Sequence, residues 1–381
     1  MDAVLLVVYV ALVMLFAFVG INQKGPFYSI QVCNAQLDLH KFFSLILLAY
    51  LFVLASINTS CPDYSSYRMI YYIGLPYDDG FNTFIEFCKN LGIEYHQFRI
   101  IVFAISYTCI LIYLWQIKVN TDLALALYAI YPFFFDAIQI RNLLAFSIII
   151  VFLPMLFKNG KKGLVCFVGA VLLASTVHKL SLIYIILVYV KLKDSKTKMR
   201  LLAAIFVTSF IFMIVCKFYP SNFTLLFNVF SDIADEHRSS YASKNFGMIK
   251  LGFLFSSFME LLFLASAYFS HKAYGFVPNI VCKEKINYPK IIFQINTIMS
   301  CTFPVFLIGG EFYRVFRNLA LINYLIPINN IWLKQNIPSN VIKSDLQKST
   351  CFFIAGFVIN WLQHTVVNGF DRVVLVFFES P

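Results

Sequence analysis

Apolar runs of roughly 17 to 21 residues recur along the whole chain, and no other feature restricts its fold as strongly. A helix of about 20 residues spans the hydrocarbon core of a bilayer, and it satisfies its backbone hydrogen bonds internally where no water is present. The chain is 60% hydrophobic and only 13% charged, with a mean hydropathy of +0.77. The sequence therefore predicts an all-α polytopic integral membrane protein, with one membrane domain over residues 1–381.

We expect about twelve transmembrane helices from these runs. Their predicted bounds are 3–20, 41–57, 99–117, 122–138, 139–157, 164–178, 179–193, 201–219, 251–270, 291–308, 315–333 and 350–366. The first run follows Asp2 rather than a basic segment, and no small-residue cleavage site comes after it. We interpret it as a retained helix rather than a signal peptide.

Lysine-rich short loops set the predicted orientation, because positively charged loops stay in the cytoplasm. These loops are 158–163, 191–200, 272–290 and 334–348. Because successive helices alternate in direction, both termini and two long connections, 58–98 and 218–250, are then predicted on the extracytoplasmic side, called the outer face below. Long loops in a compact protein are more often functional than passive, so both are candidate parts of a site.

Lysine and arginine separate across this predicted topology. Seventeen of 22 lysines fall inside, whereas seven of eight arginines fall at the outer face. The orientation rule treats the two residues alike, but the planar guanidinium binds phosphate oxygens two at a time. The outer face is therefore predicted to bind an anion such as phosphate; the alternative is that these arginines only reach toward headgroups from helix ends.

The first outer loop combines aromatic and charged side chains suited to binding sugars. Its segment "SCPDYSSYRMIYY" holds Asp63, Tyr64, Tyr67 and Arg68. The next segment, "FNTFIEFCKNLGI", places apolar residues at helical spacing and predicts an amphipathic helix, either on the outer interface or packed against the protein. This predicted stripe contains Phe81, Phe84, Ile85, Cys88 and Leu91.

Four polar clusters lie at predicted outer helix ends or in outer loops. They are "DAIQIRN" with Asp136, Gln139, Arg141 and Asn142; "STVHKLS" with His178 and Lys179; "GGEFYRVFRN" with Glu311, Tyr313, Arg314 and Arg317; and "SDIADEHRSSY" with Asp232, Asp235, Glu236, Arg238 and Tyr241. Arg141 stands out, because apolar residues flank it for a full span on both sides. Simpler alternatives are a buried hydrogen-bonded His178 and local ion pairs of Asp63 with Arg68 and of Glu311 with Arg314.

Several function classes find no support in the sequence. There is no dinucleotide or nucleotide phosphate loop, no HExxH, no GxSxG and no DxD pair. The nine cysteines are widely scattered, and the net charge of +11 follows the topology rather than forming a nucleic-acid surface. We predict no cofactor, no metal ligand set and no nucleic-acid partner, although Asp78 and Asp79 leave metal dependence open.

The chain resembles the EpsG-like family, Wzy-type polymerases of bacterial exopolysaccharides and capsules. The resembling segments are "DYSSY" (63–67), "FNTFIEFCKNLGI" (81–93), "QIRNLLAFSI" (139–148), "KNGKK" (158–162), "LLASTVHKLSLI" (172–183) and "GGEFYRVFRN" (309–318). Similarity is clearest over about 58–195, and four residues match recurrent polar positions: Asp63, Arg141, His178 and Arg314. Ser175 and Thr176 depart from the usual apolar character there.

The resemblance implies a membrane glycosyltransferase with a C-type, membrane-embedded fold, facing outward from the bacterial cytoplasmic membrane. It would transfer a glycan from undecaprenyl pyrophosphate to the non-reducing end of another lipid-linked repeat unit. Flippase and chain-length regulator proteins of the same pathway are the implied partners.

The residues above then divide into three hypothetical roles. The pyrophosphate ligands would be Arg141 and Arg314, assisted by Arg317 or Arg238, and the general base would be His178 or Asp63. The predicted sugar-binding residues are Tyr64, Tyr67, Arg68, Asn142, Glu311 and Tyr241.

Two other classes of membrane protein remain as alternatives. A lipid-linked oligosaccharide flippase or exporter would carry out no glycosyl transfer, and such proteins usually place charges at mid-membrane depth and contain internal repeats. An integral-membrane acyltransferase would need a histidine or cysteine within reach of a cytoplasmic acyl donor, whereas His178 is predicted outside.

Overall fold

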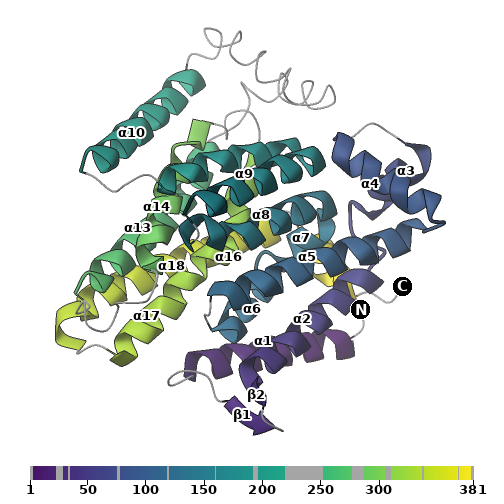
Figure 1. The fold of residues 1–381 in the computed structure, drawn as a ribbon, viewed down its shortest axis with the longest axis horizontal. Coiled ribbons are helices and arrows are strands. Elements are labelled where there is room, and N and C mark those ends of the chain that lie inside the picture. Colours follow the sequence, from purple (N-terminus) through teal and green to yellow (C-terminus); the bar gives the residue numbers. More distant parts are fainter. Residues whose placement is uncertain are drawn as a thin grey trace. The chain divides into compact units, whose positions relative to one another are not determined.

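The computed structural model describes residues 3–22, 29–32, 35–74, 78–117, 120–158, 160–191, 196–218, 252–276, 287–304, 310–336, 339–367 and 369–378. Helices dominate these residues (Figure 1). The chain divides into two compact units, unit 1 over residues 1–185 and 360–381 and unit 2 over residues 186–359. The boundaries fall within η1 (Lys179–Lys191) and α18 (Ser339–Val367). The expectation of one membrane domain stays a prediction.

Unit 1 contains most of the long apolar helices. Its elements are α1 (Ala3–Asn22), β1 (Ser29–Val32), β2 (Ala35–Asp38), α2 (Leu39–Ile57), α3 (Tyr64–Ile73), α4 (Asp79–Asn90), α5 (Tyr95–Ile117), α6 (Thr121–Ile130), α7 (Phe133–Ile138), α8 (Ile140–Lys158), α9 (Gly160–Val177), the start of η1, α19 (Phe370–Val373) and η5 (Leu375–Phe378). The two strands pair antiparallel, with Ser29 opposite Asp38. The sequence does not predict these two four-residue strands, because strands so short carry little periodic signal.

Four helices of the described residues are long and apolar enough to cross a membrane. They are Val4–Asn22, Tyr95–Ile117, Ile140–Lys158 and Gly160–Val177. Shorter apolar helices occur at Ser44–Ile57, Thr121–Ile130 and Arg200–Val215. These helices are consistent with a membrane protein, whereas the count of twelve spans stays a prediction.

The predicted span 122–138 is two helices rather than one. Helix α6 ends at Ile130 and α7 begins at Phe133, after the Tyr131-Pro132 turn. Proline lacks the N–H that would continue the helical ladder, which explains the break. Asn120 caps α6, since its Oδ1 accepts a 3.0 Å hydrogen bond from the Leu123 N–H. Its Nδ2 also donates to the Gly20 carbonyl at 2.7 Å, which ties α6 to the end of α1.

Helices α8 and α9 form a hairpin, and α8 also packs against α5 (Figure 1). Both agree closely with the predicted spans 139–157 and 164–178. Ser175 and Thr176, which interrupt the apolar end of α9, donate hydrogen bonds of 2.7 Å to the carbonyls of Leu172 and Leu173. The hydroxyls are therefore satisfied by the helix itself. Beyond them the predicted span 179–193 is the 3-10 helix η1.

Unit 2 joins its helices through buried polar side chains. Its elements are the end of η1, α10 (Lys196–Phe218), α13 (Gly252–Tyr274), α14 (Tyr288–Ser300), η4 (Gly310–Tyr313), α15 (Arg314–Asn318), α16 (Ala320–Asn323), α17 (Leu325–Asn336) and most of α18. Ser270 donates to Asn330 Oδ1 at 2.8 Å, and Asn330 donates to Ser349 Oγ at 2.9 Å. Asn296 donates to Asn323 Oδ1 at 2.7 Å. Such bonds hold apolar helices together where lipid offers no competing partner.

Helix α4 confirms the helix predicted from "FNTFIEFCKNLGI", and its apolar stripe packs inside unit 1. Phe81, Ile85 and Cys88 are buried, and the Phe81 ring lies edge-on against Phe98 of α5. The prediction that Leu91 continues this stripe is wrong: the helix ends at Asn90, and Leu91 lies in the following turn, 61% exposed. The packing alternative thus fits α4 better than a lipid-facing stripe.

Gly80 permits the close approach of α4 to α9. A Cβ atom at Gly80 would lie 2.7 Å from Thr176 Cβ and 3.0 Å from the Thr176 carbonyl carbon. Backbone cannot retreat as a flexible side chain does, so any larger residue must push the two helices apart.

We expect Gly80→Ala to lower the stability of the purified protein by about 1–3 kcal/mol through this overlap. Thermal unfolding in detergent measures the loss. Gly169→Ala is the matched control. Gly169 lies in the interior of α9, and a Cβ atom there would meet nothing within 4 Å. Equal melting temperatures for the two variants would contradict the close approach.

Candidate functional site

A buried ion pair joins the start of α4 to the start of α8. Arg141 Nη1 donates to Asp78 Oδ2 at 3.1 Å, and only 4% and 3% of the two side chains are exposed. Asp78 is the N-cap residue of α4, and Arg141 is the second residue of α8. The burial of Arg141 inside unit 1 does not fit an anchor that reaches out to headgroups. Its charge is compensated within the protein instead.

Lys179 adds a second cation to this pair. Its Nζ lies 3.9 Å from Asp78 Oδ1, and 58% of its side chain is exposed. The preceding residue, His178, is buried between the end of α9 and η1, with its N–H donating to the Ala174 carbonyl at 2.8 Å. Asp78, Arg141 and Lys179 together carry one net positive charge. We call these three residues the charge cluster.

Two further buried polar residues of the predicted site flank the start of α8. Asn142 follows Arg141 directly and is 5% exposed. Asp136, in α7, accepts a 3.1 Å hydrogen bond from the Tyr128 hydroxyl of α6. Burial of amide and carboxylate groups is costly unless they are satisfied, so these side chains are held by specific partners rather than by solvent.

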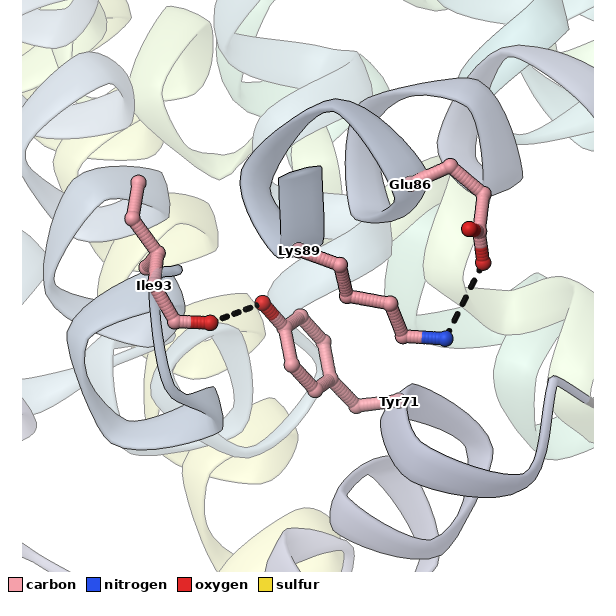
Figure 2. Close-up of polar contacts among 4 residues, drawn as sticks. All are labelled: Tyr71, Glu86, Lys89 and Ile93. Atoms are coloured by element: carbon pink, nitrogen blue, oxygen red, sulfur yellow. Dashed lines mark hydrogen bonds and ion pairs between the residues drawn. The ribbon is translucent and has the colours of Figure 1, made fainter. Parts of the chain in front are cut away.

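Helix α4, for which Asp78 is the N-cap residue, has the contacts shown in Figure 2. The Tyr71 hydroxyl of α3 donates to the Ile93 carbonyl at 2.6 Å, and Lys89 of α4 lies 5.6 Å above the Tyr71 ring. Lys89 also pairs with Glu86 at 3.0 Å. Burial raises the pKa of Tyr71 to about 12. The Tyr71 contacts with Lys89 and Ile93 therefore tie α3 to α4 and to the turn that follows it, whereas the Lys89–Glu86 pair lies within α4.

The arginine of α5 has a structural role instead of facing an anion. Arg99 is 1% exposed, and it donates to the carbonyl of Asn58 at 2.6 Å and to that of Ala55 at 3.4 Å. These carbonyls belong to the end of α2, whose last turn has no helical partners. The guanidinium also lies 4.7 Å from the Tyr64 ring centroid. Tyr64, predicted to bind sugar, thus packs against Arg99.

The other residues predicted in the first outer loop stay nearer the surface. Asp63 is the N-cap residue of α3 and is half-buried. Tyr67 is half-buried, with its ring edge-on to Phe81 at 6.5 Å, and Arg68 is exposed. The structure places all three on α3 or at its start, separate in the chain from the charge cluster.

Unit 2 holds the second predicted arginine pair. Arg314 and Arg317 are both in α15, where Arg317 is 3% exposed and Arg314 is half-buried. Tyr313, immediately before them, donates its hydroxyl to Glu260 Oε1 of α13 at 3.1 Å. Arg238, Tyr241 and the side chain of Glu311 lie outside the described residues. Within the described ranges, no three histidine, cysteine, aspartate or glutamate side chains gather as metal ligands.

The sequence motifs do not indicate a role for Glu260 or the pairing of Asp78 with Arg141. They suggest Asp78 only as a possible cation ligand, and 63 residues separate it from Arg141. No local pattern predicts a contact over that distance. Glu260 did carry a signal, since it is a carboxylate within the predicted apolar span 251–270.

A comparison with protein families matches residues 40–370 to a family described as the EpsG family. The match begins at the second residue of α2 and extends beyond the end of α18, so it includes Arg141, Arg314 and Arg317. No curated protein and no solved structure gives a significant match.

Replacing Asp78 by asparagine should destabilise the protein by about 3–5 kcal/mol, because it leaves a buried guanidinium without its carboxylate. The thermal midpoint and the amount of inserted protein measure this. Glu86→Gln is the control; it breaks the exposed Glu86–Lys89 pair and should cost about 0.2–1 kcal/mol.

The double variant Asp78→Asn, Arg141→Gln should recover part of that loss, because neither charge is then buried alone. Losses that simply add in the double variant would show that the two side chains are not coupled.

Proposed function

Since this chain belongs to the EpsG family, we propose that it polymerises a bacterial surface polysaccharide at the outer face of the cytoplasmic membrane. In this proposal it transfers a glycan from undecaprenyl pyrophosphate to the non-reducing end of another lipid-linked repeat unit. The observation that carries the proposal is the charge cluster, which combines two cations and one carboxylate from the starts of α4, α8 and η1.

The transfer breaks a bond between the sugar and the pyrophosphate. Positive charge develops on the sugar ring, while the departing phosphate oxygen receives the electron pair. Cations fixed in a site shielded from water stabilise that oxygen strongly, at about 2.7–4 kcal/mol for one well-placed donor. The enzyme needs no nucleotide, because pyrophosphate is already a good leaving group.

The charge cluster meets this requirement in a specific way. Asp78 cancels one positive charge and orients Arg141, whose planar guanidinium has a geometry suited to phosphate oxygens. Lys179 restores a net positive charge and is exposed enough to meet a substrate. We propose Arg141 and Lys179 as pyrophosphate ligands and Asp78 as the residue that positions both.

Unit 2 holds the other proposed anion ligands. These are Arg314 and Arg317 of α15, with Arg238 from the 218–250 connection assisting. The proposed sugar-binding residues are Tyr64, Tyr67, Arg68, Asn142, Glu311 and Tyr241. Among the predicted bases, His178 is adjacent to Lys179 of the charge cluster, and Asp63 is half-buried at the start of α3. Flippase and chain-length regulator proteins are the proposed partners.

Replacing Arg141 by lysine or alanine in a producing strain should stop chain growth, with transfer reduced by about 10²-fold or more. Lysine keeps the charge but lacks the fork that binds two phosphate oxygens. Polymer run on a gel should then show single repeat units, once insertion of the variant has been confirmed.

Arg372→Lys is the control for this change, since Arg372 is an exposed arginine of α19. A full-length ladder from Arg141→Lys would contradict the proposed phosphate role. Repeat units retained on the inner leaflet of a deletion strain would favour a flippase over a polymerase.

A further inference from the structure

Glu260 is a carboxylate buried within an apolar helix. It lies in α13 within the segment "SSFMELLFL", and only 3% of it is exposed. Its neighbours Met259, Leu262 and Phe263 are also buried. An ionisable side chain at such a position is costly, so it is retained more often for function than for packing.

The two oxygen atoms of Glu260 differ in their surroundings. Oε1 accepts the 3.1 Å hydrogen bond from the Tyr313 hydroxyl, whereas Oε2 is buried and meets no hydrogen-bond donor among the residues that the structure describes. Tyr313 is itself 5% exposed and is the titratable group found against Glu260 there. One oxygen is thus held in place, and the lone pairs of the other remain for a further partner.

The position of Tyr313 connects this carboxylate to the proposed substrate ligands. Tyr313 ends η4, and Arg314 begins α15 at the next residue. Glu260 therefore contacts the same short segment that carries Arg314 and Arg317. A purely structural partner for the Tyr313 hydroxyl would need only a neutral acceptor, such as glutamine, at lower cost of burial.

We propose that Glu260 is the general base of glycosyl transfer, in place of His178 and Asp63. This inference rests on the proposed polymerase function. The attacking sugar hydroxyl gives its proton to Glu260 Oε2, its oxygen forms the new bond to the anomeric carbon, and the carbon–oxygen bond to pyrophosphate breaks. The electron pair leaves with undecaprenyl pyrophosphate, while Tyr313 holds Oε1 and so directs Oε2 toward the hydroxyl.

The test uses the purified full-length protein in lipid nanodiscs. The probe is lipid-linked repeat unit extracted from a strain that lacks this protein, and chain growth is followed on gels. Glu260→Gln should lower kcat by about 10²- to 10⁴-fold and leave KM unchanged, because the amide keeps the shape and the Tyr313 bond but accepts no proton. Glu260→Asp should retain part of the activity, and Tyr313→Phe should lower kcat less than Glu260→Gln does.

Glu86→Gln is the matched control, since Glu86 is an exposed glutamate of α4 that pairs with Lys89. It should leave kcat unchanged. In the unmodified protein kcat should rise with pH as the base loses its proton, and Glu260→Gln should abolish this rise. If the glutamine variant does not insert, Glu260→Asp decides: a shifted rise of kcat with pH supports the base, and an unshifted one overturns it.

Two results overturn different parts of the argument. Normal kcat in an inserted Glu260→Gln variant overturns the role of Glu260 and leaves the polymerase function standing. Absence of chain growth from the unmodified protein, with active flipping of the same probe, overturns the polymerase function and this inference with it.

Discussion

Hydrocarbon offers no hydrogen-bond partner, so a polar group in an apolar helical protein must find its partner within the protein. The main polar contacts of this chain obey that constraint. Arg99 bonds carbonyls at the end of α2, serine and asparagine side chains bond one another between α13, α17 and α18, and Asp78 compensates Arg141. The constraint also makes Glu260 notable, because Oε2 of this carboxylate meets no donor in the described part of the chain.

The arginines predicted at the outer face divide into different environments. Arg99 is committed to capping a helix, and Arg68 is exposed on α3. Arg141 is buried with a carboxylate, while Arg317 is buried in α15. The number of arginines predicted at the outer face is therefore larger than the number available to bind an anion. Among them, Arg141 is the best suited to phosphate binding, because Asp78 orients its guanidinium and Lys179 keeps the charge cluster positive.

The proposed chemistry needs opposite properties from two carboxylates. Asp78 would serve by pairing with two cations and holding them in place. Glu260 would serve because its burial near a tyrosine leaves one oxygen to receive a proton. The environment of each carboxylate thus suggests a different role, although the two residues have nearly the same chemistry.

The sequence by itself determined the helical class, the α8–α9 hairpin, the helix α4 and the family. Hydropathy and residue spacing are local properties, and they decide helix formation within a few turns. It also indicated Arg141. Only the tertiary structure decided that Asp78 is the partner of Arg141, that Arg99 caps α2, and that Tyr313 bonds Glu260. These contacts join residues 41 to 63 positions apart, and their formation depends on how helices pack, which no local periodicity encodes.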